Sequence, residues 1–486
     1  MILVAAREEM ATLIASSPAA GFRNEAATST PVEMEPFPGA RTAWYVTGAL
    51  AVTNMVSYVE RQIPTLMFGP IKHDFGLSDT MVSLLAGFAF VLFYVGFGLF
   101  IGCLADRTSR KRIIAAGIVL WGFATMSCGL ARSFIQLFLG RVMVGVGEAT
   151  LGPSAISMLS DYFPTGKLAR AVSVYTGAQY LGAGFALVLG GLAIHVVDSL
   201  RQPVLPLVGP LHPWQTTFLV VGAIGMLVIV PVLFITEPKR RGLLNAPSGV
   251  SSRSLPLADT VMFVRQNWRT LGAHFSAFSI SSALGFGTVA WMPTYFIRIH
   301  HWAAHDIGYV YGLMLAVLGG AGVLAGARFG EWLASRGFRD AYFRAPLITL
   351  SLTGIPAALA TLMPNAEASL ILLVFSTFLS SFPVALIIAS LQLITPNQMR
   401  GQVVSLYFFV ANIFGVGLGP TLVAMITDYI YHDEMAIGYS LATATAIITP
   451  IVAFILWFGL SPYRDSLARA ATWDGQSDEG TSLCRV

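Results

Sequence analysis

The chain has 486 residues, of which 55% are hydrophobic and only 11% are charged. Soluble globular domains carry about 25% charged residues, so a soluble fold is excluded and lipid must solvate part of the surface. The formal net charge of +4 is small, and the three cysteines show no spacing typical of a metal site or a disulfide framework.

Residues 1–41 precede the first long apolar stretch. The opening run MILVAAREEMATLIASSPAAG is interrupted by Arg7, Glu8 and Glu9. It lacks the basic start and continuous apolar block of a cleaved signal peptide. We therefore expect residues 1–41 to form a cytoplasmic tail.

Twelve apolar stretches follow, each of about the length that crosses a hydrocarbon core of roughly 30 Å as a helix. We predict crossings at 42–68, 81–105, 113–131, 136–162, 171–197, 214–236, 269–299, 306–330, 345–363, 369–394, 402–427 and 438–460. The expected fold is an all-α polytopic membrane protein with two six-helix bundles. The bundles span residues 42–236 and 269–460, a cytoplasmic linker with a possible amphipathic helix spans 237–268, and a cytoplasmic tail spans 461–486.

The distribution of basic residues predicts the orientation. One side of the predicted topology collects 23 of the 29 Lys and Arg residues, and the other side collects four. Because basic loops stay in the cytoplasm, both termini are predicted to be cytoplasmic. The two remaining basic residues, Arg61 and Arg141, fall inside predicted helices.

Four charged residues lie well inside the first and fourth predicted crossings, away from the crossing ends: Glu60, Arg61, Arg141 and Glu148. A charge inside a bilayer costs at least about 2.5–3.5 kcal/mol, so it usually faces a partner or a water-filled cavity. With a rise of about 1.5 Å per residue, Arg141 comes level with Glu60, and Glu148 lies one turn deeper. We predict that Glu60 contacts Arg141 and that Arg61 contacts Glu148.

This charge network has two interpretations. It can be a static set of buried ion pairs that fixes helix packing, or it can be the functional centre. Asn54 and Tyr58 lie on the same polar stretch of the first crossing and are candidate members of the network. The glycines around Glu148 are expected to allow close helix packing.

The two halves echo each other. The sequence LADRTSRK begins at Leu104, and LASRGFRD begins at Leu333, 229 residues later. Both lie in basic loops at matching places in the predicted topology. A duplicated six-helix unit is one known layout of transporters.

The stretch GCLADRTSRKR at residues 102–112 resembles the loop signature of the major facilitator superfamily. The resemblance implies that Gly102, Asp106, Arg107 and Arg110 form a gating loop that latches one state. The alternative is that its basic residues act only as topology determinants.

More narrowly, SYVERQIP, GRVMVGVGEATLGPSAISMLSDYFP and TPNQMRGQVVSLYFFVANIFGVGLGP resemble the spinster branch of that superfamily. Spinster proteins usually carry Asp where this chain has Glu60, which keeps the charge but lengthens the side chain. The resemblance implies a proton-coupled secondary transporter of sphingoid or lysophospholipid molecules. It also implies a monomer in the bacterial inner membrane without a cofactor, a metal or a nucleic-acid partner.

The residues suggest how protons and substrate could be coupled. Burial favours the neutral form of a carboxylic acid, whereas a nearby arginine favours the carboxylate. If substrate breaks the arginine contact, Glu148 takes up a proton, with Glu60 as the second candidate. Arg61 or Arg141 could instead hold an anionic head group.

Other functions remain to be weighed against this hypothesis. A transporter of small organic anions would use the same arginines. An ATP-driven pump is disfavoured because no phosphate-binding loop occurs. A membrane-embedded lipid-modifying enzyme would need a converging nucleophile and base, so we expect no enzyme activity, and a channel would carry measurable single-channel current. The sequence leaves open the substrate, transport direction, proton stoichiometry and gate state.

Overall fold

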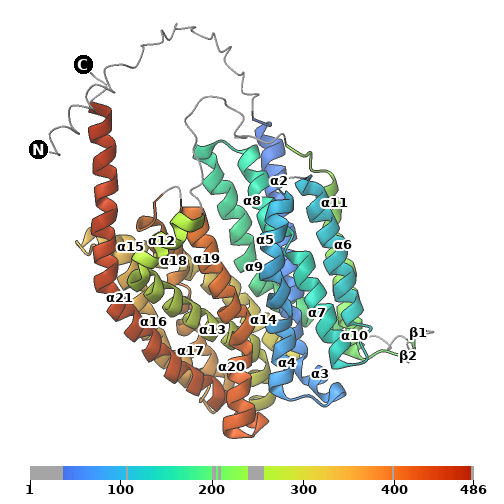
Figure 1. The fold of residues 1–486 in the computed structure, drawn as a ribbon. Coiled ribbons are helices and arrows are strands. Elements are labelled where there is room, and N and C mark those ends of the chain that lie inside the picture. Colours follow the sequence, from blue (N-terminus) through green and yellow to red (C-terminus); the bar gives the residue numbers. More distant parts are fainter. Residues whose placement is uncertain are drawn as a thin grey trace, which may run out of the picture. The chain divides into compact units, whose positions relative to one another are not determined.

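The computed structural model describes residues 37–105, 108–199, 204–205, 209–238, 257–396 and 399–482. Residues from Pro38 onward form one compact unit, and nearly all of its described residues lie in helices (Figure 1). The strands among them are β1 (Val204–Leu205) and β2 (Gly209–Pro210), which pair antiparallel in a loop. Helix packing therefore builds the core.

The helices fall into an N-terminal and a C-terminal set separated by the short helix α12 (Leu257–Gln266). The N-terminal set is α2 (Ala40–Gln62), η1 (Ile63–Met67), α3 (Phe68–Phe75), α4 (Asp79–Ala86), α5 (Phe88–Ala105), α6 (Arg110–Cys128), α7 (Phe134–Glu148), α8 (Leu151–Tyr162), α9 (Thr165–Ser199), α10 (Pro213–Met226) and α11 (Ile229–Leu233). The C-terminal set is α13 (Trp268–Ile299), α14 (Ala304–Met314), η2 (Leu315–Gly319), α15 (Gly320–Ser335), α16 (Ala341–Ala360), α17 (Ala366–Ser380), α18 (Pro383–Leu393), α19 (Arg400–Asn412), η3 (Ile413–Leu418), α20 (Gly419–Met425), η4 (Ile426–Tyr431), η5 (Glu434–Ala436) and α21 (Ile437–Ser482).

Eleven helical stretches of the described chain are long and apolar enough to cross a membrane, and they correspond to predicted crossings two to twelve. The first predicted crossing is α2 with η1. Its 23-residue helix buries Asn54, Ser57, Glu60 and Arg61, and these polar residues lower its hydropathy. Because α2 packs along α9 inside the bundle, it completes the expected set of twelve helices.

Several crossings depart from a continuous α-helix, among them the fourth and the eleventh. The fourth was predicted as one helix, but α7 ends at Glu148 and α8 begins only at Leu151. In the eleventh, the π-helix η3 precedes Pro420, which lies in the first turn of α20. Proline is tolerated there because first-turn amides have no intrahelical partner.

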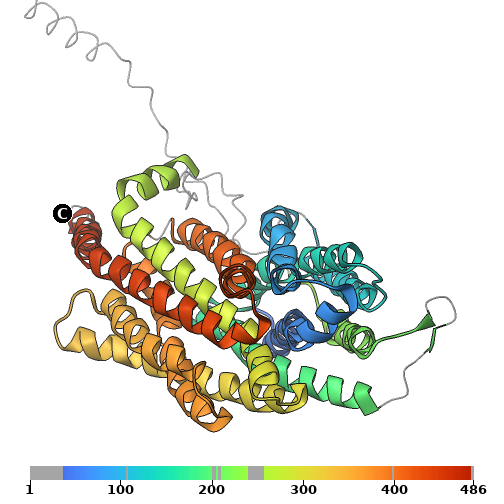
Figure 2. The same ribbon diagram turned by 90° about the horizontal axis from the view of Figure 1, so that it is seen from below.

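The two sets form separate bundles, which Figure 2 shows as blue-to-green and yellow-to-red groups of helices. In the first bundle α2 packs on α9, and α6 packs on both α7 and α10. In the second, α13 and α16 both pack on α21, and α16 also packs on α17. Each bundle thus has its own helix–helix core.

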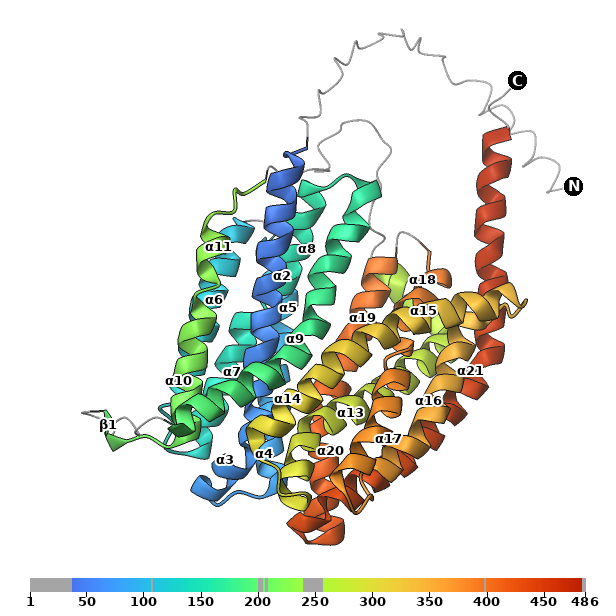
Figure 3. The ribbon, with the colours of Figure 1, turned by 180° about the vertical axis from the view of Figure 1, so that it is seen from behind.

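The bundles meet along α9 and α14, which run side by side in Figure 3. A Cβ built on Gly184 of α9 would lie 2.5 Å from the carbonyl oxygen of Gly312 in α14. Such small residues let helix backbones approach closely. Further contacts join α5 to η3, α4 to α20 and η1 to α13.

The bundles have two ends, which we call the Arg110 end and the Asp79 end. The Arg110 end holds the start of α6, the end of α8 and the start of α19, whereas the Asp79 end holds α3, the start of α4, the end of α13 and η5. Helix α12 lies at the Arg110 end and contacts α13 and α19. It buries Phe263 and exposes Val261 and Met262, as expected for an amphipathic surface helix.

Candidate functional site

A buried ion pair joins α2 to α7. Arg61 Nη2 donates to Glu148 Oε2 at 2.7 Å, and the Ser57 hydroxyl donates to the same oxygen at 2.7 Å. The side chains of Arg61 and Glu148 are 6% and 0% exposed. Ser57 and Arg61 share one face of α2 because they are four residues apart. The predicted contact between Arg61 and Glu148 is confirmed.

Aromatic rings surround the Arg61 guanidinium. Its central carbon lies 4.1 Å from the ring centroid of Phe90, 4.5 Å from that of Tyr58 and 5.0 Å from that of Tyr94. A cation over an aromatic face is stabilised by about 0.5–2 kcal/mol, and more when it is desolvated. The rings therefore hold the guanidinium in place beside Glu148 without neutralising its charge.

The ion pair leaves two buried polar atoms unsatisfied. Among the described residues, Glu148 Oε1 and Arg61 Nε have no hydrogen-bond partner. A carboxylate is satisfied by several hydrogen bonds, and an unpaired polar atom in an apolar interior is costly. The pair thus keeps one acceptor and one donor for a proton, a water molecule or a ligand.

Arg141 does not pair with the carboxylate of Glu60, so that prediction is wrong. Its guanidinium instead donates to three backbone carbonyl oxygens: Leu85 at 3.2 Å, Arg61 at 3.3 Å and Glu60 at 3.5 Å. The side chain is fully buried. Arg141 therefore ties α7 to α2 and α4 through main-chain acceptors.

The Glu60 carboxyl lies on a different side of α2, toward α6 and α10. Glu60 Oε2 accepts a hydrogen bond from the Thr125 hydroxyl at 2.6 Å, and Oε1 is buried without a partner. A Cβ built on Gly225 of α10 would lie 1.7 Å from Glu60 Oε1. Successive helical residues point about 100° apart, which explains why Glu60 and Arg61 face different helices.

Asn54 and Tyr58 lie beside the pair but in different roles. Asn54 Nδ2 donates to the Tyr175 carbonyl oxygen at 3.0 Å, which joins α2 to α9. Tyr58 packs its ring on the Arg61 guanidinium. Tyr58 therefore contacts the ion pair directly, whereas Asn54 joins α2 to α9 beside it.

Glu148 owes its position to a short glycine run and a helix break. A Cβ on Gly145 would lie 2.3 Å from the Phe90 carbonyl oxygen, and one on Gly147 would lie 2.7 Å from Trp121 Cβ. The glycines let α7 pack directly on α5 and α6, as expected. Glu148 is the last residue of α7, immediately before the break.

Arg110 is the best-defined member of the predicted gating loop. It contacts Asp161, and its Nε donates to Glu237 Oε1 at 2.9 Å. Burial acts to raise the pKa of Glu237, but hydrogen bonds from the Lys111 amide, Arg110 and Ser109 hold that pKa below its ordinary value. Asp161 lies in α8 and Glu237 lies at the start of the linker, so Arg110 ties the start of α6 to both segments.

The predicted gating loop also includes Gly102, Asp106 and Arg107. Gly102 lies in α5, close to its end at Ala105. Asp106 and Arg107 lie outside the described residues. The predicted gating role of this loop therefore stays a prediction.

A second ion-pair network links the bundles at the Asp79 end. Asp79 at the start of α4 accepts hydrogen bonds from Arg298 Nη1 and Nη2 of α13 at 2.6 and 2.8 Å. Lys72 donates to Asp79 at 2.7 Å and also lies 2.7 Å from Glu434 of the second bundle. Asp79 is 1% exposed, so this network is largely removed from water.

Sequence reasoning missed this network. Ser78 caps α4 by accepting a hydrogen bond from the Met81 amide. An acidic residue directly after such a cap is stabilised by the helix N-terminus, so Asp79 gave no sign of a distant partner. Arg298 lies 219 residues away along the chain. The one signal in the sequence was Arg298 itself, an isolated basic residue at the predicted end of crossing seven.

Comparison with known proteins assigns the family. Residues 50–420 match the family model described as Major Facilitator Superfamily. This match covers well over half of the chain. This chain belongs to the Major Facilitator Superfamily.

Among its relatives, this transporter is 28% identical over 436 residues to an MFS-type efflux pump of Mycolicibacterium smegmatis, covering 89% of this chain and 96% of the pump. It is 25% identical to the sphingosine-1-phosphate transporter SPNS2 of Danio rerio, covering 84% and 82% of the two chains. Its fold matches a bacterial homolog of the human lysosomal transporter Spinster, solved in an inward-facing and unoccupied conformation. That match has a TM-score of 0.73 and 21% identity and covers 89% of this chain and 99% of the other.

These similarities confirm the predicted spinster-like, two-bundle membrane transporter fold. The chain is a multi-pass integral membrane protein whose family acts on small-molecule substrates. Its family and structural neighbours are transporters, which agrees with the expectation that the chain is not an enzyme.

The packing of Gly225 on Glu60 makes a testable prediction. In the wild-type background, Gly225→Ala should lower the thermal unfolding midpoint, because the new methyl group overlaps Glu60 Oε1. In a Glu60→Ala background the same substitution should cost less. Residues in contact show coupling energies of about 0.5–3 kcal/mol.

The control for this cycle is Gly48→Ala, where a Cβ meets nothing within 4 Å. Equal costs of Gly225→Ala in both backgrounds would show that Glu60 does not occupy the space beside Gly225.

Proposed function

We propose that this protein is a proton-coupled secondary transporter of amphipathic, lipid-like molecules in which Glu148 carries the proton. One observation supports this above all. Glu148 is fully buried, Oε2 is bonded to Arg61, and Oε1 has no partner among the described residues. Oε1 can therefore accept a proton. Protonation of Glu148 would weaken its ion pair with Arg61.

Competition for Arg61 would couple the proton to the substrate. While Arg61 holds Glu148, the carboxylate form is favoured. A substrate phosphate that accepts hydrogen bonds from two Arg61 nitrogens in bidentate fashion would draw the guanidinium away, and Glu148 Oε1 would then bind a proton. Release of the substrate would restore the pair and expel the proton.

The surroundings of Arg61 support a lipid-like substrate. Phe90 and Tyr94 flank the guanidinium with apolar ring surface, and the relative from Danio rerio is a sphingosine-1-phosphate transporter. A phosphate head group would meet Arg61, and a hydrocarbon chain would lie on aromatic and aliphatic side chains. A sphingoid or lysophospholipid molecule has both parts.

A small organic anion is the second candidate. The buried, permanently charged guanidinium of Arg61, with Nε unpaired, would bind any carboxylate or phosphate. Such a substrate would need no hydrocarbon chain. Asn54 and Arg141 would support either substrate indirectly, by fixing α2 against α9 and α7.

Glu60 is proposed as a second proton site. It is 1% exposed, and its Oε1 has no hydrogen-bond partner within the part of the chain that the structure describes. Because it faces Thr125 rather than Arg61, a substrate at Arg61 would affect it only through movement of α2. The protonation of Glu60 is therefore expected to change when the helices of the bundle move, and not through direct contact with substrate.

We further propose a monomer in a bacterial inner membrane with the Arg110 end and both termini in the cytoplasm. The excess of basic residues on that side supports this orientation. In this orientation the Asp79 network closes the outer end of the path between the bundles. Alternating access would require this network to break when the outer side opens.

Uptake by the purified protein in liposomes tests the proposal. With an imposed pH gradient, radiolabelled sphingosine-1-phosphate or a lysophospholipid should accumulate, and collapse of the gradient with a protonophore should stop it. A hexuronate serves as the small-anion comparison. Accumulation of the hexuronate alone would select the second candidate, and uptake that ignores the gradient would reject proton coupling.

A further inference from the structure

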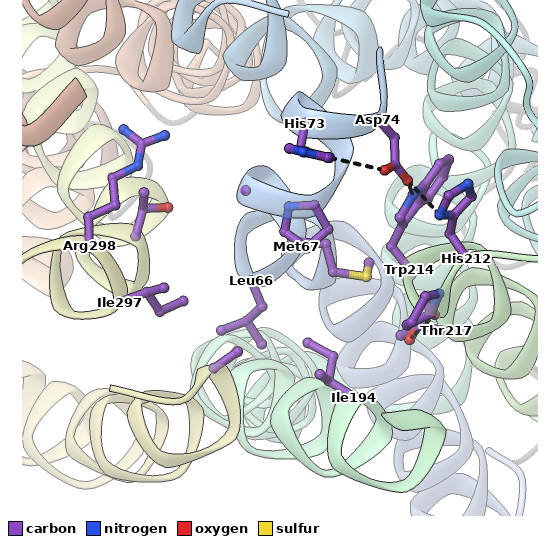
Figure 4. A pocket seen from close by; sticks show the side chains of 15 residues that line it. Leu66, Met67, His73, Asp74, Ile194, His212, Trp214, Thr217, Ile297 and Arg298 are labelled. Atoms are coloured by element: carbon purple, nitrogen blue, oxygen red, sulfur yellow. Dashed lines mark hydrogen bonds and ion pairs between the residues drawn. The ribbon is translucent and has the colours of Figure 1, made fainter. Parts of the chain in front are cut away.

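A cavity of about 490 Å³ lies at the Asp79 end, between the two bundles (Figure 4). Its walls come from η1, α3, α9 and α10 of the first bundle and from α13 and α14 of the second. Sites for small ligands usually measure about 300–1,000 Å³. The cavity therefore has the size of a ligand site, and it lies apart from the Arg61–Glu148 pair, since neither residue lines it.

The lining of this cavity is aliphatic on one side. Leu66, Met67, Ile194 and Ile297 contribute to this part of the lining, and in Figure 4 Leu66 and Met67 lie between Ile297 and Asp74. Ile194 and Ile297 are partly exposed and present most of this apolar surface, whereas Leu66 and Met67 are almost completely buried behind it. Apolar surface of this kind favours a hydrocarbon chain by about 25 cal/mol for each Å² that the chain removes from water.

A polar group lies at the opposite side of the cavity. Asp74 Oδ2 accepts a hydrogen bond from Trp214 Nε1 at 2.6 Å and lies 3.1 Å from His212 Nδ1, while Oδ1 lies 3.6 Å from His73 Nδ1. Asp74 is 18% exposed, whereas the two histidines are largely open to solvent. The Asp74 carboxylate is the acidic member of this group.

The cationic residue on the other wall is already neutralised. Both Nη atoms of Arg298 bond to Asp79, which does not line the cavity. The charge that faces the cavity without a full counter-charge is therefore that of Asp74. A partly buried anion beside an aliphatic wall attracts a cation more strongly than an exposed one does, because its surroundings have a low effective dielectric constant.

We propose that this cavity is a separate binding site for single-chain amphiphiles with a cationic ammonium head group. The ammonium group lies against Asp74, and the hydrocarbon chain covers Leu66, Met67 and the two isoleucines. The proposal rests on the cavity alone and is independent of the proton-coupling role of Glu148.

Binding of radiolabelled dodecyltrimethylammonium to the purified full chain in detergent micelles at pH 8 tests the site, with binding to empty micelles subtracted. Asp74→Asn should weaken binding at least tenfold while keeping an oxygen for Trp214 Nε1. Gly69→Leu should weaken it similarly, because Gly69 lines the cavity and a Cβ there meets nothing within 4 Å.

Two matched controls keep the test specific. Asp306→Asn removes an exposed carboxylate on the neighbouring α14, and Gly48→Leu adds a side chain at an open position on α2. Both should bind the probe as the wild type does. Wild-type affinity in Asp74→Asn or Gly69→Leu, or equal binding of dodecyl sulfate, would overturn the proposal.

Discussion

Replacing Glu148 by Gln is expected to reduce proton-driven uptake to the background of empty liposomes. Glutamine nearly preserves the size of the side chain and an oxygen that can accept from Arg61 and Ser57, which both bond to Glu148 Oε2. It cannot bind and release a proton near neutral pH. The variant should therefore fold and insert while losing the coupling that the proposed mechanism needs.

The measurement compares two kinds of transport by the same preparation. Uptake driven by an imposed pH gradient should disappear, whereas exchange of labelled for unlabelled substrate without a gradient should continue. Glu331→Gln is the matched control, because Glu331 lies exposed on α15. If Glu148→Gln retained uptake that responds to the pH gradient, Glu148 would not be the proton carrier.

The second large effect is expected at Asp79. Asp79→Asn removes the buried anion that Arg298 and Lys72 share and leaves them the exposed Glu434; the two cations are 12% and 13% exposed. Removal of one partner of a buried ion pair costs about 3–5 kcal/mol, and this cost falls on the state in which the Asp79 end is closed. The population should therefore shift toward a state that is open at the Asp79 end.

Spin labels can measure this shift. Arg132 lies exposed between α6 and α7, and Leu362 is 43% exposed between α16 and α17, so labels at these positions report the separation of the bundles at the Asp79 end. In Asp79→Asn the distance distribution should gain a longer component. Glu434→Gln should change it little, since Glu434 is 58% exposed and exposed ion pairs contribute about 0–1 kcal/mol.

An unchanged distance distribution in Asp79→Asn would show that the network does not hold the bundles together. A second carboxylate, Asp428 of η4, also crosses between the bundles by accepting from the Thr80 amide at 2.7 Å. If Asp79→Asn has only a partial effect, the double variant with Asp428→Asn should enlarge it.

The sequence by itself determined the membrane fold and one half of the site. Apolar length fixed the twelve crossings, because a helix must satisfy its own backbone hydrogen bonds in lipid. The contact between Arg61 and Glu148 was also predictable, since two opposite charges at similar depth in one bundle have few ways to avoid each other. Their neighbours on α2 follow from helical periodicity.

Only the tertiary structure decided the partner of Glu60, the break after Glu148 and the network around Asp79. Depth along a helix can be counted from sequence, but the rotation of each helix is set by packing against its neighbours. Adjacent residues point about 100° apart, so Glu60 faces Thr125 while Arg61 faces Glu148. Asp79 and Arg298 meet because two separately folded bundles dock, and that docking is recorded in no local pattern of the chain.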